Sequence, residues 1–327
     1  MKALNLFIFF TLPFFSMATL ADDLRPISLN INTKDNKVFS IVWKIPSKKN
    51  KRMPLSLEFD DNAIMLKPKE VHFYGNAFVE HYTIKREKGL KGLKIKVRGL
   101  QYVLAEVLLR FNDKDGNTKT IMLNATQDTF ELDGTIEADN SLSTYIVLGI
   151  KHILVGLDHL LFIACLFFIA GTKRKLLYTV TGFTIAHSLT LILSSMGILS
   201  VPVPPVEAVI ALSIVFLAVE IAKNNQDGLS MKYPVLVSTT FGLLHGLGFA
   251  TVLAEIGLPP NEKVSALLYF NIGVEIGQLV FITTLFILYK ILIFIVGSIK
   301  KEKVYLLVSY SSGTVAMSWL LARLSNF

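Results

Sequence analysis

The sequence predicts an α-helical polytopic membrane bundle of about six transmembrane helices, preceded by a signal peptide and a small all-β extracytoplasmic domain. Two observations predict this fold class. Hydrophobic residues make up 52% of the 327-residue chain, which is typical of an integral membrane protein. Charged residues crowd into roughly the first 140 positions and then thin out abruptly, so a soluble region precedes a membrane-embedded one.

Residues 1–21 have the composition of a secretory signal peptide. Lys2 precedes an apolar run from Leu4 to Phe15, and Thr19 and Ala21 suit a small-residue cleavage site. An uncleaved membrane anchor is the alternative. In both cases the following region is exported.

Residues 22–138 predict an exported β-sandwich-like domain. Its strand candidates are runs rich in β-branched and aromatic residues, at Val38–Ile45, Phe78–Ile84, Leu93–Val97, Val103–Phe111 and Thr118–Leu123. The turn sequence at 113–117 predicts a hairpin between the last two. His72 and His81 show no metal-ligand spacing along the chain. We expect contact, gating or capture of an unknown extracytoplasmic protein or ligand.

A polar linker at 133–142 leads into the predicted transmembrane domain, residues 139–327. Each of its six apolar segments approaches the roughly 20 residues that a bilayer core requires. We expect them at about 143–170, 176–197, 203–222, 234–256, 264–289 and 304–323. The fifth is either one long tilted helix or a helix with an interfacial extension, because apolar sequence continues to Ile299.

Basic residues predict the orientation of the bundle. They follow the first, third and fifth segments, at Lys173–Lys175, Lys223 with Lys232, and Lys300–Lys303, whereas the intervening loops hold only Lys263. By the positive-inside rule the basic loops are cytoplasmic. We therefore expect a bacterial-type inner membrane protein whose N-terminal domain and C-terminus are extracytoplasmic. Because the net charge of +8 arises largely in these short loops, a nucleic-acid partner is not expected.

Ionisable side chains within the apolar segments predict one intramembrane site. Such groups cost roughly 2.5–3.5 kcal/mol at the bilayer centre and usually face a cavity or an ion path. The candidate metal ligands are His152, Asp158, His159, His187, Glu207, His245 and Glu275. Supporting polar residues on the same helix faces are Thr184, Ser188, Asn271 and Gln278. The pairs Gly242–Gly246 and Gly273–Gly277 would let helix backbones approach closely.

Helical spacing divides these ligands into two levels. On one continuous helix, seven residues separate His152 from His159 by about 10 Å, too far for one ion to bind both readily. We therefore expect an outer step of His152 and Glu207. The expected central group comprises Asp158, His159, His187, His245 and Glu275.

The donor types indicate the ion. Imidazoles and carboxylates without thiolates suit Ni²⁺, Zn²⁺, Co²⁺ or Fe²⁺. Cys165 is the single cysteine, so neither a disulfide within the chain nor a soft-metal cluster is possible. The alternative is that each histidine only forms hydrogen bonds across helices.

Five motifs match a known family. They are His152-x3-Gly156-x-Asp158-His159, Phe183-Thr-x-Ala-His-Ser188, Val206-Glu207, Leu244-His-Gly-x-Gly248 and Asn271-x3-Glu275. On these motifs the chain resembles the HupE/UreJ family of hydrogenase and urease accessory membrane proteins, regarded as nickel permeases, in the branch with an added exported domain. It departs at Ile153, where the family usually has proline. The resemblance implies nickel binding by these histidines and acids, with transport across the inner membrane.

Three functions compete at this stage. The first is transport or delivery of a divalent metal ion, nickel before zinc, cobalt or iron, which would not be an enzyme activity. The second is an intramembrane zinc hydrolase assisted by Ser188 or Glu275, although the chain has no H-E-x-x-H or G-x-S-x-G motif. The third is an envelope assembly or structural factor that uses the β domain as its binding module.

Overall fold

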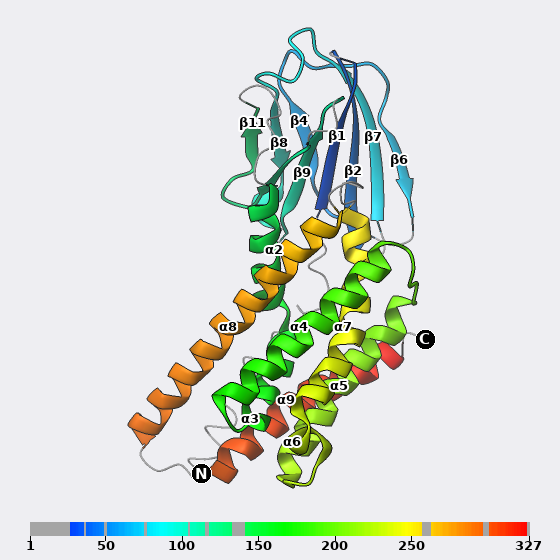
Figure 1. Ribbon diagram of the computed structural model, residues 1–327. Helices are drawn as coiled ribbons and strands as arrows, with labels where there is room; N and C mark the ends of the chain where they lie inside the picture. The colour runs from blue at the N-terminus through cyan, green and yellow to red at the C-terminus, as the bar shows by residue number, and fades with distance from the viewer. Residues whose placement is uncertain are drawn as a thin grey trace. The chain divides into compact units, whose positions relative to one another are not determined.

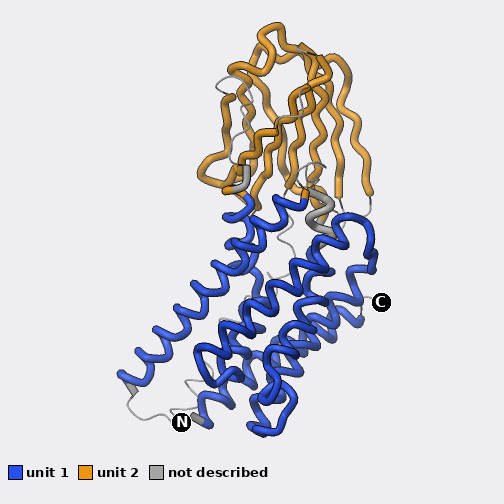
Figure 2. The backbone as a smooth tube through the Cα atoms, in the orientation of Figure 1, with its two compact units in different colours: residues 1–22, 145–251, 264–327 blue, residues 23–144, 252–263 orange. Residues whose placement is uncertain are grey.

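The computed structural model describes residues 27–35, 37–48, 51–74, 77–103, 105–114, 118–132, 141–256, 263–296 and 301–325. The chain forms two compact units, one built chiefly of strands and the other of helices (Figure 2). An N-terminal β-sheet region therefore precedes a helical region, as predicted. The predicted signal peptide and most of the predicted linker lie outside the described residues.

The β unit contains two sheets (Figure 1). Its strands are β1 (Ile27–Asp35), β2 (Val38–Lys48), β3 (Lys51–Arg52), β4 (Ser56–Phe59), β5 (Ile64–Met65), β6 (Glu70–Phe73), β7 (Ala77–Lys85), β8 (Lys94–Arg98), β9 (Val107–Asn112), β10 (Thr118–Leu123) and β11 (Thr129–Glu131). The larger sheet has the order β10-β9-β1-β2-β7-β5, with β3 beside β2 and β6 beside β7, and the smaller sheet has the order β11-β8-β4. β1 and β9 pair in parallel.

Alternation of apolar and polar residues builds the core of this unit. Ile27, Leu29 and Ile31 of β1 are fully buried, because successive side chains of a strand point to opposite faces. They share one apolar cluster with Ile95 and Val97 of β8. The two sheets therefore enclose a common core.

All five predicted strands are present, and Thr118–Leu123 has the predicted bounds, whereas the other four differ at their ends. Val103–Phe111 is the least accurate, because Gly99 has a φ of 89° and the 3₁₀ helix η1 (Leu100–Tyr102) follows, so β9 begins only at Val107. The predicted β9–β10 hairpin is confirmed by antiparallel pairing that starts at Asn112 and Thr118. The prediction missed β1, which lies between β2 and β9.

Buried charges in the β unit are paired. Arg86 is 1% exposed, lies 3.1 Å from the Asp60 carboxylate and donates to backbone carbonyls at positions 91 and 92. The Glu80 carboxylate, equally buried, accepts from Arg52 and from the hydroxyl of Tyr82. Burial, together with the adjoining carboxylate, raises the pKa of Tyr82.

The helical unit contains the predicted apolar segments. Its helices are α2 (Ser141–Val155), α3 (Leu157–Ile169), α4 (Lys173–Ser195), α5 (Val203–Lys223), α6 (Leu229–Lys232), α7 (Pro234–Ile256), α8 (Lys263–Val296) and α9 (Lys301–Leu324) (Figure 1). Four of them, α4, α5, α8 and α9, are long and apolar enough to cross a membrane, and α2 with α3 makes a fifth span if the bent pair is one crossing. The apolar part described in α7, Pro234–Phe249, is shorter. α8 is one continuous helix of 34 residues.

The first predicted segment is not one continuous helix. It breaks at Gly156, and α2 and α3 are bent by 73°. Gly156 has an extended backbone, with φ −70° and ψ 98°, and a Cβ there would lie 2.8 Å from both the His152 carbonyl oxygen and Nδ1 of His159. The bend therefore depends on glycine at this position, and the straight-helix assumption for this segment was wrong.

Both glycine pairs lie at close helix contacts, as predicted. A Cβ at Gly273 of α8 would overlap the carbonyl oxygen of Ile146 in α2, and one at Gly277 would lie 3.2 Å from the Ile150 carbonyl oxygen. A Cβ at Gly246 of α7 would likewise overlap the carbonyl oxygen of His187 in α4. These contacts bring α2, α4, α7 and α8 close enough for their short polar side chains to meet.

Candidate metal centre

Three histidines meet at the bend between α2 and α3. His152 lies in the last turn of α2, His159 lies in the first turn of α3 and His187 lies in the middle of α4. One ring nitrogen from each lies within 4.8 Å of the others, and the ring centroids of His152 and His159 are 4.7 Å apart. The predicted separation of about 10 Å was wrong because it assumed a continuous helix. His152 therefore belongs to the histidine group and not to an outer step.

His245 of α7 lies beside this group, outside the set of three histidines whose ring nitrogens lie within 4.8 Å of one another. It is 1% exposed, and its ring centroid lies 5.3 Å from that of His159. Phe162 and Phe183 lie against the same ring, each with centroids 5.1 Å away. The four imidazoles thus form one cluster that also contacts aromatic rings, a setting of low dielectric where polar interactions are strong.

The hydrogen bonds of His187 define its tautomer. Nδ1 lies 3.1 Å from Oδ1 of Asn271, while Nδ2 of Asn271 donates to the Leu267 carbonyl oxygen at 2.8 Å. Since the amide nitrogen is engaged by a carbonyl, the amide oxygen faces the ring and accepts from Nδ1–H. The lone pair of a neutral His187 is therefore on Nε2. An outer partner of this kind commonly fixes the tautomer of a metal-binding histidine.

His159 and His245 are arranged in the same way. Nδ1 of His159 lies 3.0 Å from Oδ1 of Asp158, which accepts its proton and leaves Nε2 with the lone pair. Oγ of Ser213 donates to the Ile210 carbonyl oxygen at 2.7 Å and lies 3.3 Å from Nε2 of His245. The serine oxygen then accepts from Nε2–H, and the lone pair of His245 is on Nδ1.

Each of these free nitrogens is buried. Nε2 of His152, His159 and His187 and Nδ1 of His245 have no hydrogen-bond partner among the described residues. A buried polar atom without a partner costs about 1–3 kcal/mol, so four together are expensive in a folded protein. Neutral imidazole lone pairs of this kind suit a borderline metal ion such as Ni²⁺, Co²⁺ or Zn²⁺. The donor set therefore fits such an ion.

Glu275 lies in a separate polar row between α4 and α8. Its Oε1 accepts from Thr181 at 2.6 Å, and Thr184 donates to Oε1 of Gln278 at 2.8 Å. Oε2 of Glu275 and Nε2 of Gln278 are buried without a described partner. Thr181 precedes His187 by six residues, about 9 Å along the helix axis. Glu275 is thus outside the set of three histidines whose ring nitrogens lie within 4.8 Å of one another.

Glu207 meets a residue that the sequence did not suggest. Its Oε2 lies 3.6 Å from Nε of Arg323, and NH1 of Arg323 donates to the Glu207 carbonyl oxygen at 3.1 Å. The sequence did contain a signal for this contact, because Arg323 is a basic residue in the last turn of an apolar helix. Such a charge is rarely left without a partner.

The hydroxyl group of Ser188 does not donate to the histidine group. That group donates to the Thr184 carbonyl oxygen at 2.6 Å within α4, a common arrangement for serine inside a helix. Among the supporting residues, Asn271 therefore orients His187. Thr184 and Gln278 belong to the polar row of Glu275, and Ser188 bonds only within its own helix.

Residues 126–323 match the family model described as HupE / UreJ protein. The chain belongs to the HupE / UreJ family. The match covers the helical unit with its histidine group, and most of the β unit precedes it. A comparison with curated proteins gave no match. Membership of the HupE / UreJ family, together with the apolar helices, makes this a multi-pass membrane protein with a metal-related accessory function.

Proposed function

We propose that the protein moves a divalent transition-metal ion, Ni²⁺ first, across a bacterial inner membrane. The observation that supports this most strongly is the set of four buried imidazole nitrogens, three of them on rings whose other nitrogen is held by Asp158, Asn271 or Ser213. The rings are thus oriented toward an ion before it arrives. The metal is the cargo in this proposal.

In this proposal six crossings place the β unit and the C-terminus outside, and the signal peptide exports the β unit. The alternating basic loops support this orientation. Glu207 lies near the start of α5 and Arg323 near the end of α9. In this orientation both helix ends are on the outer side of the membrane. The row of Thr181 and Glu275 lies on the cytoplasmic side of the histidines, because α4 starts at the basic loop.

Three positions then form an inward path. Glu207, which also pairs with Arg323, offers a carboxylate at the outer end, the histidines with Asp158 beside them replace the water of the ion, and Glu275 offers a carboxylate further in. Charged or polar side chains within spanning segments usually face such paths. A row that continues past the histidines favours transport over an intramembrane hydrolase, which needs only one closed site with a bound water.

Uptake of radioactive nickel by cells that produce the protein tests this function. The variant His159→Ala/His187→Ala is expected to lower uptake at least tenfold, to the level of cells without the protein. Ser188→Ala is the matched control, since its hydroxyl bonds only within α4, and it should retain uptake within about twofold. Equal uptake by wild type and the double variant, at equal protein amounts in the membrane, would contradict the proposal.

A further inference from the structure

A second group of metal-binding side chains lies in the β unit, on the outer face of the larger sheet. Strands β6 and β7 form an antiparallel pair in which Glu70 is opposite His81 and His72 is opposite Val79. Residues two apart on a strand share a face, so all three side chains project from the same side. The chain order conceals this group, which is why the spacing of His72 and His81 gave no signal.

The distances within this group suit a shared cation. The ring centroids of His72 and His81 are 6.0 Å apart, and Nε2 of His72 lies 3.9 Å from Oε2 of Glu70. Two imidazoles that bind one ion at 2.0–2.1 Å have ring centroids about 5 Å apart. His72 and Glu70 are exposed, so a rotation that moves a ring by about 1 Å is sterically available.

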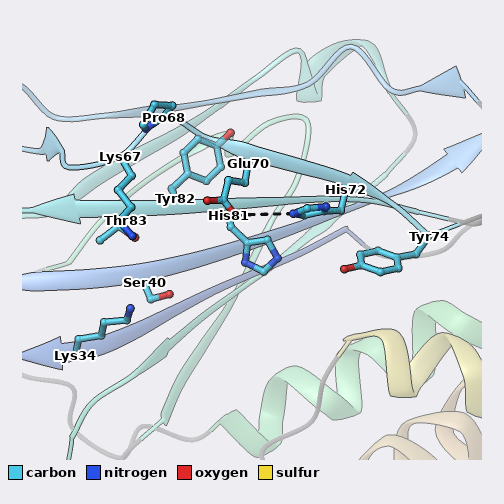
Figure 3. A pocket seen from close by; sticks show the side chains of 10 residues that line it. All are labelled: Lys34, Ser40, Lys67, Pro68, Glu70, His72, Tyr74, His81, Tyr82 and Thr83. Carbon is cyan, nitrogen blue, oxygen red and sulfur yellow. Dashed lines mark ion pairs between the residues drawn. The ribbon is translucent and has the colours of Figure 1, made fainter.

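These residues line one end of a pocket of about 310 Å³ (Figure 3). That volume is at the lower end for small-molecule sites and is much larger than an ion requires. Hydroxyl groups of Ser40, Thr83 and Tyr74 also line it. The space beside the three metal-binding side chains can therefore hold a small organic ligand.

The other end of the pocket is positively charged. Lys34 and Lys67 line it, and in the view of Figure 3 their ammonium groups lie away from the two imidazoles. Both side chains are exposed, and neither forms an ion pair with a residue that the structure describes. Two ammonium groups disfavour a bare dication but attract carboxylates. The pocket thus combines donors for a metal with partners for an anion.

We propose that this pocket captures a divalent transition-metal ion that arrives bound to a small polycarboxylate chelator. The imidazoles of His72 and His81, with the Glu70 carboxylate, take open coordination positions on the ion. Lys34 and Lys67 hold the free carboxylates of the chelator. The proposal rests on the proposed function only in the choice of nickel as the ion, and binding here can be measured without transport.

Histidine footprinting of the full-length protein in detergent tests the site directly. Diethyl pyrocarbonate modifies accessible imidazoles, and peptide mass spectrometry gives the rate at each histidine separately. Nickel citrate at 100 µM, roughly the affinity range of a few exposed ligands, is expected to slow modification of His72 and His81 at least fivefold. Citrate alone should leave both rates unchanged.

Two sets of variants test the assigned contacts. Lys34→Ala/Lys67→Ala is expected to remove most protection by nickel citrate while protection by aqueous nickel remains. The control Lys88→Ala/Lys114→Ala removes the same charge from exposed positions outside the pocket. In this control nickel citrate should protect His72 and His81 as it does in the wild type. Glu70→Gln should weaken protection by both forms of nickel.

Several results would overturn the inference. They are unchanged rates at both histidines with nickel citrate, protection by aqueous nickel only, or protection that both lysine variants retain equally. Because the readout is local to His72 and His81, loss of nickel uptake in the membrane variants would not affect it. Conversely, a failed footprint would leave the transport proposal standing.

Discussion

In the β unit, the buried Arg86 guanidinium meets the Asp60 carboxylate and three backbone carbonyls. In the helical unit, the buried His159 ring meets Asp158 through one nitrogen only, and its other nitrogen has no described partner. Both groups are removed from water, where unpaired polar atoms are costly. Satisfied networks such as the first hold a fold together, whereas incompletely satisfied ones mark places where a ligand completes the structure.

The largest expected effect comes from breaking a satisfied pair. Asp60→Asn leaves the Arg86 charge buried without a counterion and should destabilise the β unit by about 3 kcal/mol. Thermal unfolding followed by Trp43 fluorescence measures it, in a Trp319→Phe background that removes the other tryptophan. Asp61→Asn, an exposed neighbour, should change the midpoint by no more than a degree or two. Equal midpoints for the two variants would mean that the buried pair contributes nothing.

Removing a histidine from the incompletely satisfied group should have little effect on stability without metal and a large effect with metal. Without metal, His187→Ala should change the thermal stability of the helical unit by no more than about 1 kcal/mol, because removal of a costly unpaired acceptor offsets loss of the hydrogen bond to Asn271. With nickel at about 100 times the dissociation constant, wild type should gain about 2.7 kcal/mol and the variant should lose that gain. Loss of stability in the metal-free variant alone would identify His187 as purely structural.

A smaller effect is expected at the residues that orient the rings. Asn271→Leu keeps the volume of the side chain and removes the acceptor for Nδ1 of His187, so nickel affinity should fall about 10- to 100-fold. Calorimetric titration of the purified protein measures this. Thr283→Val is a control in the same helix, since that hydroxyl bonds only to Leu279. Unchanged affinity in Asn271→Leu would show that the histidine tautomer does not depend on this contact.

The smallest effect concerns pH. Burial opposes ionisation of Asp60, but hydrogen bonds from the Lys94 backbone and from Arg86 outweigh it and lower the pKa of Asp60 below its usual value. The resulting stability is fully present above the unfolded pKa of about 3.9 and is lost as pH falls through the lower folded value. Denaturation of the β unit between pH 5 and pH 2 should therefore be steeper for wild type than for Asp60→Asn. Parallel curves would contradict this.

Local patterns predicted much of the fold. Alternation around Val38–Ile45 located β2, and apolar length located the spanning helices, because both depend on residues close in sequence. β1 was missed since its place between β2 and β9 depends on pairing with distant chain segments. In the candidate site, residue types were informative and distances were not. The bend occurs at Gly156, where a Cβ would crowd the His152 carbonyl oxygen and Nδ1 of His159, and periodicity does not reveal such crowding.

Contacts between residues that are distant in sequence were also not predicted. Arg323 and Glu207 are 116 positions apart, and only the packing of α9 on α5 brings them together. Likewise, His72 and His81 become neighbours only through the register of β6 and β7. A single sequence specifies which side chains are chemically able to bind a metal, but strand register and helix contacts decide which of them meet.

The bend at Gly156 would also couple ion binding to the angle between α2 and α3. His152 and His159 lie on opposite arms of the joint, each within about 6 Å of the pivot along its helix. A change of 10° in the angle between the arms therefore displaces one ring relative to the other by about 1 Å, several times the ±0.2 Å tolerance of a coordination bond. An ion held by both rings must fix the angle, and torque on either arm must change how tightly the ion is held.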